Sequence, residues 1–233
     1  MTEPTYTPEW IEISSGDATL RGHRWPGDLL TVVLLHEPGE GYDLDRWRSL
    51  IPYLIGNKAT VLAIDLRGHG ASDGEWNDVT SVQDVSEIVT RTREQATFVV
   101  VCAEGASSTA ALRAVESSQI DGLILISPPA VEGEPPRGEG VTKLLIAGSQ
   151  SPGFPDNVNT LRNASIGPAL SVLLPTTAQG SDILSSEMAV TCRAHIVKFL
   201  NERRFEARRA AGVRPPRDEF LWRLGLTPRG ESE

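Results

Sequence analysis

The sequence has few cysteines, no long apolar run and no excess of positive charge. Only two of its 233 residues are cysteine. Because Cys102 falls in an expected buried strand and Cys192 in an expected helix, no disulfide is predicted. No apolar run approaches the roughly 20 residues that a membrane span needs, and the first residues lack the regions of a signal peptide. These absences predict a cytoplasmic protein that does not contact a membrane.

The net charge is −9 at pH 7, which argues against a nucleic-acid-binding surface. No two of the four histidines have metal-ligand spacing, and no glycine motif is typical of a phosphate site. Neither a metal nor another cofactor is therefore predicted. The 39% of hydrophobic and 23% of charged residues describe an ordinary globular protein. A chain of this length can form one domain with a full core.

Apolar runs alternate with segments of helical periodicity. An edge hairpin is expected from residues 10–13 and 19–24. The further expected strands are residues 31–35, 59–66, 98–102, 122–126, 143–147 and 169–174. The expected helices are residues 44–54, 79–95, 106–117 and 186–209. This alternation predicts an α/β fold with a mostly parallel, twisted sheet of about eight strands and helices on both faces.

The stretch from Thr97 to Leu112 is the centre of this pattern. A β-rich apolar run reaches Cys102, and small residues then lead into a helix. A strand that passes directly into a helix in this way must turn sharply, with no room for large side chains. The turn reads Cys102-Ala-Glu104-Gly-Ala106, and its apex is expected at Glu104.

Four further motifs occur in an order that resembles the α/β-hydrolase superfamily. They are His36-Glu-Pro-Gly39, Ala63-Ile-Asp-Leu-Arg-Gly-His-Gly-Ala-Ser-Asp73, Gly122-Leu-Ile-Leu-Ile-Ser-Pro128 and Leu173-Leu-Pro-Thr-Thr-Ala-Gln-Gly-Ser-Asp-Ile-Leu184. The resemblance implies one α/β-hydrolase-like domain over residues 1–200, with an arginine-rich extension over 201–233. Only 16 residues separate Ile126 from Lys143, so no inserted cap domain is expected.

The resemblance also assigns the three positions of a catalytic triad, and each holds an unsuitable residue. Glu104 stands at the nucleophile position, Ser151 at the acid position and Gln179 at the base position. A serine hydrolase needs a hydroxyl nucleophile, an imidazole base and a carboxylate that orients the imidazole. The sequence therefore predicts a degenerate triad and a non-catalytic protein that binds a small ligand or a partner.

An enzyme with a rearranged site is the alternative. Ser107 is the nucleophile if the turn is shifted along the chain, and Glu104 can attack as a carboxylate, as aspartate does in related dehalogenases and epoxide hydrolases. The alternative function is thus a hydrolase of an ester or similar small molecule that uses Glu104, His36 or Ser107. The residues expected to line a pocket are His36, Glu37, Glu104, Gly105, Ser107 and Gln179.

Structural roles are expected for several of these groups. The carboxylate of Glu104 would complement the N-terminus of the helix that follows, which stabilises a protein by about 0.3–1 kcal/mol. His36 and His69 are expected to brace their loops.

The C-terminal extension differs in charge from the rest of the chain. Residues 201–233 have eight arginines and six acids, whereas residues 1–200 have 14 basic and 25 acidic residues. Phe220, Leu221, Trp222 and Leu224 give residues 217–226 an apolar face. A helix of that length is marginal alone in water. We therefore expect it to dock on its own domain, on a second copy or on an acidic protein partner.

Overall fold

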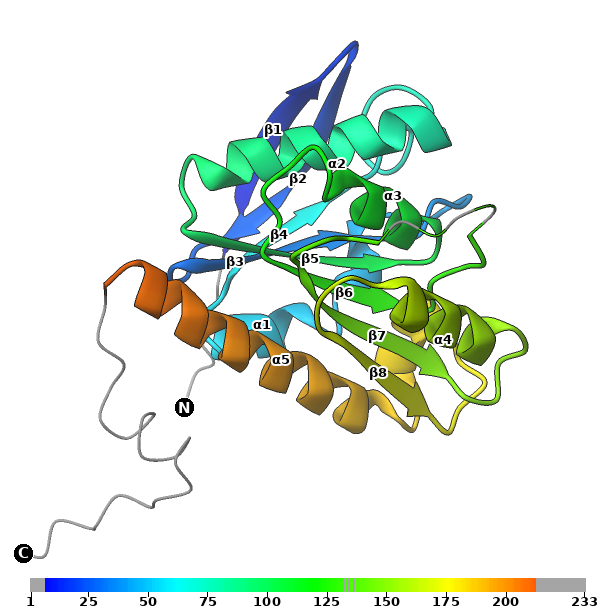
Figure 1. The fold of residues 1–233 in the computed structure, drawn as a ribbon. Helices are drawn as coiled ribbons and strands as arrows, with labels where there is room; N and C mark the ends of the chain where they lie inside the picture. Colours follow the sequence, from blue (N-terminus) through cyan, green and yellow to red (C-terminus); the bar gives the residue numbers. More distant parts are fainter. Residues whose placement is uncertain (1–6, 132, 134, 136, 213–233) are drawn as a thin grey trace, which may run out of the picture.

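The computed structural model describes residues 7–131, 133, 135 and 137–212, and within them eight strands form one sheet (Figure 1). The order across the sheet is β1-β2-β4-β3-β5-β6-β7-β8. The strands are β1 (Glu9–Ser15), β2 (Ala18–Trp25), β3 (Leu30–Leu35), β4 (Thr60–Ile64), β5 (Phe98–Glu104), β6 (Gly122–Ile126), β7 (Thr142–Gly148) and β8 (Ala169–Leu174). β2 pairs antiparallel with β1 and β4, and the other neighbours are parallel. The predicted mostly parallel sheet is confirmed.

Helices cover both faces of the sheet (Figure 1). They are η1 (Leu44–Trp47), α1 (Ile51–Gly56), α2 (Asp78–Arg93), α3 (Ala106–Ala114), α4 (Phe154–Ala164), η2 (Gly180–Ser185) and α5 (Ala189–Ala210), where η marks a 3₁₀ helix. Side chains of α2, α3 and α4 pack into one apolar layer, and side chains of α1 and α5 pack into the other.

The central strand β3 shows how the sequence produces both layers. All six of its residues are buried, as expected for a parallel strand that is covered on both faces. Because successive side chains of a strand point to opposite faces, Val33 and Leu35 belong to one layer and Val32 and Leu34 to the other.

The helices differ from the sequence prediction in three places, one of which is the unpredicted η2. The segment expected as one helix over residues 44–54 is divided into η1 and α1. Pro52 lies in the first turn of α1, where its missing N–H leaves no hydrogen bond unmade. Helix α4 was not predicted, although its Phe154, Val158 and Leu161 have helical spacing and all three pack into the core.

The connection from β6 to β7 holds no cap domain, since the described residues between them form neither helix nor strand. Buried Lys143 closes this connection by donating to the carbonyls of Gly138, Val141 and Ile166. At the other end of the chain, α5 continues through residue 200 to Ala210, while residues 217–226 lie outside the described part. None of the described helices is long and apolar enough to cross a membrane.

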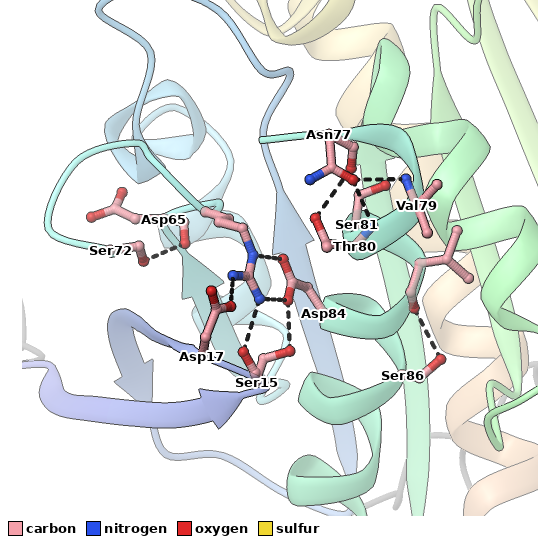
Figure 2. Close-up of polar contacts among 12 residues, drawn as sticks. Ser15, Asp17, Asp65, Ser72, Asn77, Val79, Thr80, Ser81, Asp84 and Ser86 are labelled. Atoms are coloured by element: carbon pink, nitrogen blue, oxygen red, sulfur yellow. Dashed lines mark hydrogen bonds and ion pairs between the residues drawn. The ribbon is translucent and has the colours of Figure 1, made fainter. Parts of the chain in front are cut away.

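A buried ion-pair network joins the β1–β2 hairpin to α2 (Figure 2). Arg67 donates from Nε and Nη2 to the two oxygens of Asp84, at 3.0 and 2.8 Å. It also donates to the Ser15 carbonyl and to Asp17, at 2.8 and 2.7 Å. The Ser15 hydroxyl donates to Asp84. The side chains of Arg67 and Asp84 are only 4% and 5% exposed, whereas that of Asp17 is 94% exposed. The hydrogen bonds that Arg67 donates to Asp84 raise the pKa of Arg67, so this guanidinium stays charged.

Candidate functional site

The turn after β5 is strained at Gly105. β5 ends at Glu104 and α3 begins at Ala106, and Gly105 between them has φ +54° and ψ −133°. Residues with a side chain rarely adopt this backbone conformation because it is strained for them, whereas glycine adopts it readily. The apex of the turn is therefore Gly105, one residue later than the sequence analysis expected.

The carboxyl group of Glu37 fills the space above this apex. Glu37 follows β3 by two residues, and the carboxyl ends of β3 and β5 are adjacent in the sheet. A Cβ atom added to Gly105 would lie 2.7 Å from Oε2 of Glu37 and closer still to its Cδ and Oε1. Any side chain at the apex would therefore collide with Glu37 as it lies in this structure.

Glu37 lies in surroundings that disfavour its charge. Partial burial is the largest cause of its raised pKa, and the neighbouring carboxylate of Glu104 is the second. Arg46 acts in the opposite direction, while Asp182 raises the pKa further.

Glu104 itself is held in a buried ion pair. Its side chain is fully buried, and Oε1 accepts a hydrogen bond from Nε of Arg46 at 2.9 Å. Oε2 accepts from the backbone N–H of Ser181, in the first turn of η2. A Cβ atom on the neighbouring Gly180 would collide with this oxygen, so only glycine permits the close approach. The expectation that Glu104 complements the helix after it is corrected, because its carboxylate binds η2 and Arg46 instead.

Arg46 links this buried carboxylate to the surface. Its Nη2 lies 3.3 Å from Asp182, whose side chain is 70% exposed, and its guanidinium stacks 4.1 Å from the ring centre of Tyr42. The sequence analysis missed Arg46, Asp182 and Tyr42. Nothing in the sequence connects Arg46 with Glu104, which lie 58 positions apart.

The other groups proposed for a rearranged site are bonded to the backbone. Nε2 of His36 accepts from the Leu66 N–H at 3.1 Å, and Nδ1 lies 2.8 Å from the Glu37 carbonyl. Burial lowers the pKa of His36, which favours a neutral ring. Ser107 is fully buried, and its hydroxyl donates to the His36 carbonyl. His69 accepts from the Gly39 N–H at 3.0 Å.

The structure places the expected acid position, Ser151, beside the loop that leads to the expected base position, Gln179. Ser151 is buried, and its hydroxyl donates to the carbonyl of Thr177 at 2.8 Å. Gln179 is exposed and precedes η2. Among the described residues no group of three or more histidine, cysteine, aspartate or glutamate side chains could hold a metal ion.

A cavity of about 280 Å³ opens beside the turn, between α2, α3 and the loop after β6. None of the six residues expected to line a pocket borders it. Its described lining includes Ala106, Asp78, Thr109 and Arg113. Ala106 directly follows Gly105, so the cavity lies next to the turn.

Replacing Glu37 with glutamine is expected to change how stability depends on pH. Below the unfolded-state pKa the Glu37 carboxyl is protonated in both states, so the fold bears no cost. As pH rises through the raised folded-state pKa, the fold must hold a carboxylate in unfavourable surroundings, and the wild type loses stability. The free energy of unfolding of Glu37→Gln should therefore increase relative to wild type between pH 4 and pH 8.

Urea denaturation across this pH range would measure the difference. Glu40→Gln removes one negative charge from an exposed residue of the same loop and serves as the control. A difference between Glu37→Gln and wild type that stays constant or shrinks with rising pH would contradict the account of Glu37.

The comparisons with known proteins agree with this architecture. The chain resembles the Pyrococcus furiosus esterase Pf2001 (TM-score 0.71, 17% identity, covering 85% of this chain and 94% of that one). It also resembles a proline iminopeptidase from Mycobacterium smegmatis (TM-score 0.71, 12% identity, covering 85% of this chain and 100% of that one). A third similar structure is epoxide hydrolase A from Mycobacterium thermoresistibile (TM-score 0.66, 14% identity, covering 83% of this chain and 98% of that one). At these identities the likeness concerns the fold alone.

None of the curated proteins that were compared matches the chain. The family model described as "Alpha/beta hydrolase family" matches residues 32–229. This match covers most of the chain, and it includes the turn at Gly105 and every neighbour of Glu104 named above. The chain therefore belongs to the alpha/beta hydrolase family.

Proposed function

We propose that this chain is a non-catalytic member of its family, which binds a small ligand or a protein partner at the carboxyl ends of its strands. The observation that carries the proposal is the apex of the turn after β5. In a nucleophile elbow the nucleophile occupies the strained residue between strand and helix. Here that residue is Gly105, with φ +54°, and it has no side chain.

The space that a nucleophile would need is also filled. Glu37 projects its carboxyl group over Gly105, where an elbow enzyme needs both the nucleophile and room for a substrate carbonyl. A carboxylate there would repel the oxyanion that forms during ester hydrolysis, whereas an active site stabilises that oxyanion with hydrogen-bond donors.

The remaining triad positions support the same proposal. Ser151 donates its proton to a backbone carbonyl, and its neutral hydroxyl cannot supply the negative charge with which a triad carboxylate stabilises an imidazolium. The amide of Gln179 cannot take up a proton at neutral pH. Loss of a single triad member commonly lowers the rate by about 10⁴-fold or more.

A hydrolase with a rearranged site is less well supported, because each of its three groups is already bonded. Glu104 is paired with Arg46, Ser107 donates to a carbonyl, and both ring nitrogens of His36 contact the backbone. A nucleophile or base needs a free lone pair within reach of the substrate. Glu37 is the titratable group that remains nearest the apex, so it belongs in any test of activity.

A ligand has a place beside the turn. The cavity next to Ala106 offers Asp78 and Arg113, which have opposite charges, and the Thr109 hydroxyl. Its volume of about 280 Å³ suits a small polar molecule better than a long acyl chain, since pockets for larger ligands occupy about 300–1,000 Å³.

Ester hydrolysis by the purified chain is expected to stay at the background rate. The measurement uses p-nitrophenyl acetate and butyrate, with heat-unfolded protein as the background and an active serine esterase as the positive control. Labelling with a serine-directed fluorophosphonate, followed by mass spectrometry, should give no adduct, because the apex has no hydroxyl. Activity above background that is abolished by Glu37→Gln, Glu104→Gln or Ser107→Ala would overturn the non-catalytic proposal and name the group responsible.

A further inference from the structure

The two outer strands of the sheet are protected very differently. Natural proteins guard sheet edges with charged side chains, prolines or bulges, because unpaired backbone groups there would pair with another strand. The β1 edge has Glu9 and Glu12, which form ion pairs with Arg24 and Arg21 of β2. Strand β8 reads Ala-Leu-Ser-Val-Leu-Leu and contains no charged residue and no proline, although Pro168 and Pro175 flank it and Arg162 of α4 donates to the Ser171 hydroxyl. Within the described part of the chain it pairs on one side only, with β7.

Apolar side chains are exposed on both faces of the sheet at this edge. Leu170 and Leu173 are 50% and 40% exposed, and they point to opposite faces because three positions separate them. Leu170 borders a groove of about 380 Å³ between β8 and α5, whose floor includes Leu144 and Phe199. The edge thus combines unpaired backbone groups with exposed leucines, which is how strand-addition surfaces recognise a partner.

We propose that β8 is the surface through which two copies of this chain associate. The two β8 strands pair antiparallel about a two-fold axis perpendicular to the sheet, which makes one continuous sheet across both copies. A strand without charges pairs with itself without electrostatic repulsion. A two-fold axis also makes the interface self-complementary, so each residue that contacts the partner has its counterpart.

The charges beside the groove are compatible with a second copy as the partner. Lys198 and Glu202 border it and lie one turn apart on α5. The two-fold axis places the α5 helices of both copies antiparallel on the same face of the sheet. Lys198 of one copy then faces Glu202 of the other, and the same pair forms again on the far side of the axis. A partner with charges of one sign only would be repelled either by Lys198 or by Glu202. A second copy offers an opposite charge to each of them.

Sedimentation velocity on the full chain, over a wide range of concentration, tests this proposal. The wild type is expected to reach twice its chain mass of 25.2 kDa. Leu170→Lys and Leu173→Lys place charges on the edge and should give monomers, with circular dichroism confirming that they fold. Val79→Lys is the matched control, because Val79 is apolar and 82% exposed but lies on the first turn of α2, away from β8 (Figure 1). It should leave the dimer unchanged.

Charge exchange distinguishes a second copy from any other occupant of the edge. Lys198→Glu and Glu202→Lys should each weaken the dimer, because like charges would then face each other twice. The double variant with both changes restores opposite charges across the two-fold axis and should recover the dimer. Recovery in the double variant is specific to self-association through this face.

Two results would overturn the proposal. The first is a wild type that is monomeric at every concentration, and a lower melting temperature of Leu170→Lys would then indicate that residues of the same chain cover β8. The second is a dimer that persists in both leucine variants, which would place the interface elsewhere.

Discussion

Replacing Asp84 with alanine is expected to lower the free energy of unfolding by about 3–5 kcal/mol, the range typical of a broken buried ion pair. Asp84 is 5% exposed and accepts two hydrogen bonds from Arg67, which is itself 4% exposed. The substitution leaves Arg67 charged and largely without water, with only Asp17 and the Ser15 carbonyl as partners. Because the network joins the β1–β2 hairpin to α2, the hairpin should also lose protection from amide hydrogen exchange.

Asp17→Ala is the matched control for this prediction. Asp17 binds the same guanidinium at 2.7 Å, but its side chain is 94% exposed, and exposed ion pairs contribute about 0–1 kcal/mol. Urea denaturation at pH 7 compares the two variants. A second test replaces both partners, as Arg67→Met with Asp84→Leu, and should recover most of the loss because no charge is left unpaired. If Asp17→Ala costs as much as Asp84→Ala, burial does not determine the strength of this network.

The second large effect is expected at Glu104. Glu104→Gln keeps the shape of the side chain, and its amide oxygen can still accept from the Ser181 N–H. It removes the negative charge that binds Arg46 at 2.9 Å, so the guanidinium remains close to a buried neutral group. We expect the free energy of unfolding to fall by about 3 kcal/mol, at the lower end for buried pairs because Arg46 is 16% exposed.

Asp182→Asn provides the comparison at the same guanidinium. Asp182 is 70% exposed, and its removal should cost less than about 1 kcal/mol. Thermal and urea denaturation of both variants give the ratio of the two effects. A loss below about 1 kcal/mol for Glu104→Gln would mean that Glu104 contributes no more than a carboxylate at a helix terminus does, which contradicts the paired and buried arrangement.

Most of the fold could be predicted from the sequence, because it follows from patterns that are local. The six strands expected after the hairpin are largely apolar runs, and every one of them appears in the sheet within a few residues of its expected bounds. Helix α4 was missed because only Phe154, Val158 and Leu161 mark its buried face, and most of its other positions are polar. The break before α1 is marked in the sequence by Pro52 alone, which favours the first turn of a new helix.

The candidate site could be predicted less well, because its interactions join distant parts of the chain. The sequence placed His36, Glu37 and Glu104 near one another, since parallel strands end at the same edge of a sheet. It could not show which of two adjacent residues takes the strained conformation, and Gly105 rather than Glu104 does. The partner of Glu104 also depends on how η1 lies over β5, which no periodicity in residues 44–54 determines.

Helix α5 has a consequence for the synthesis of this protein. It packs against β3, β5 and β7, and its Ile196, Phe199 and Leu200 complete one of the two apolar layers. A ribosome adding about 5–20 residues per second needs on the order of ten seconds to proceed from β3 to α5. During that interval α1 already packs on this face of the sheet, but the apolar side chains that α5 covers stay exposed. The apolar layer on this face is therefore complete only after residues 189–210 have left the exit tunnel.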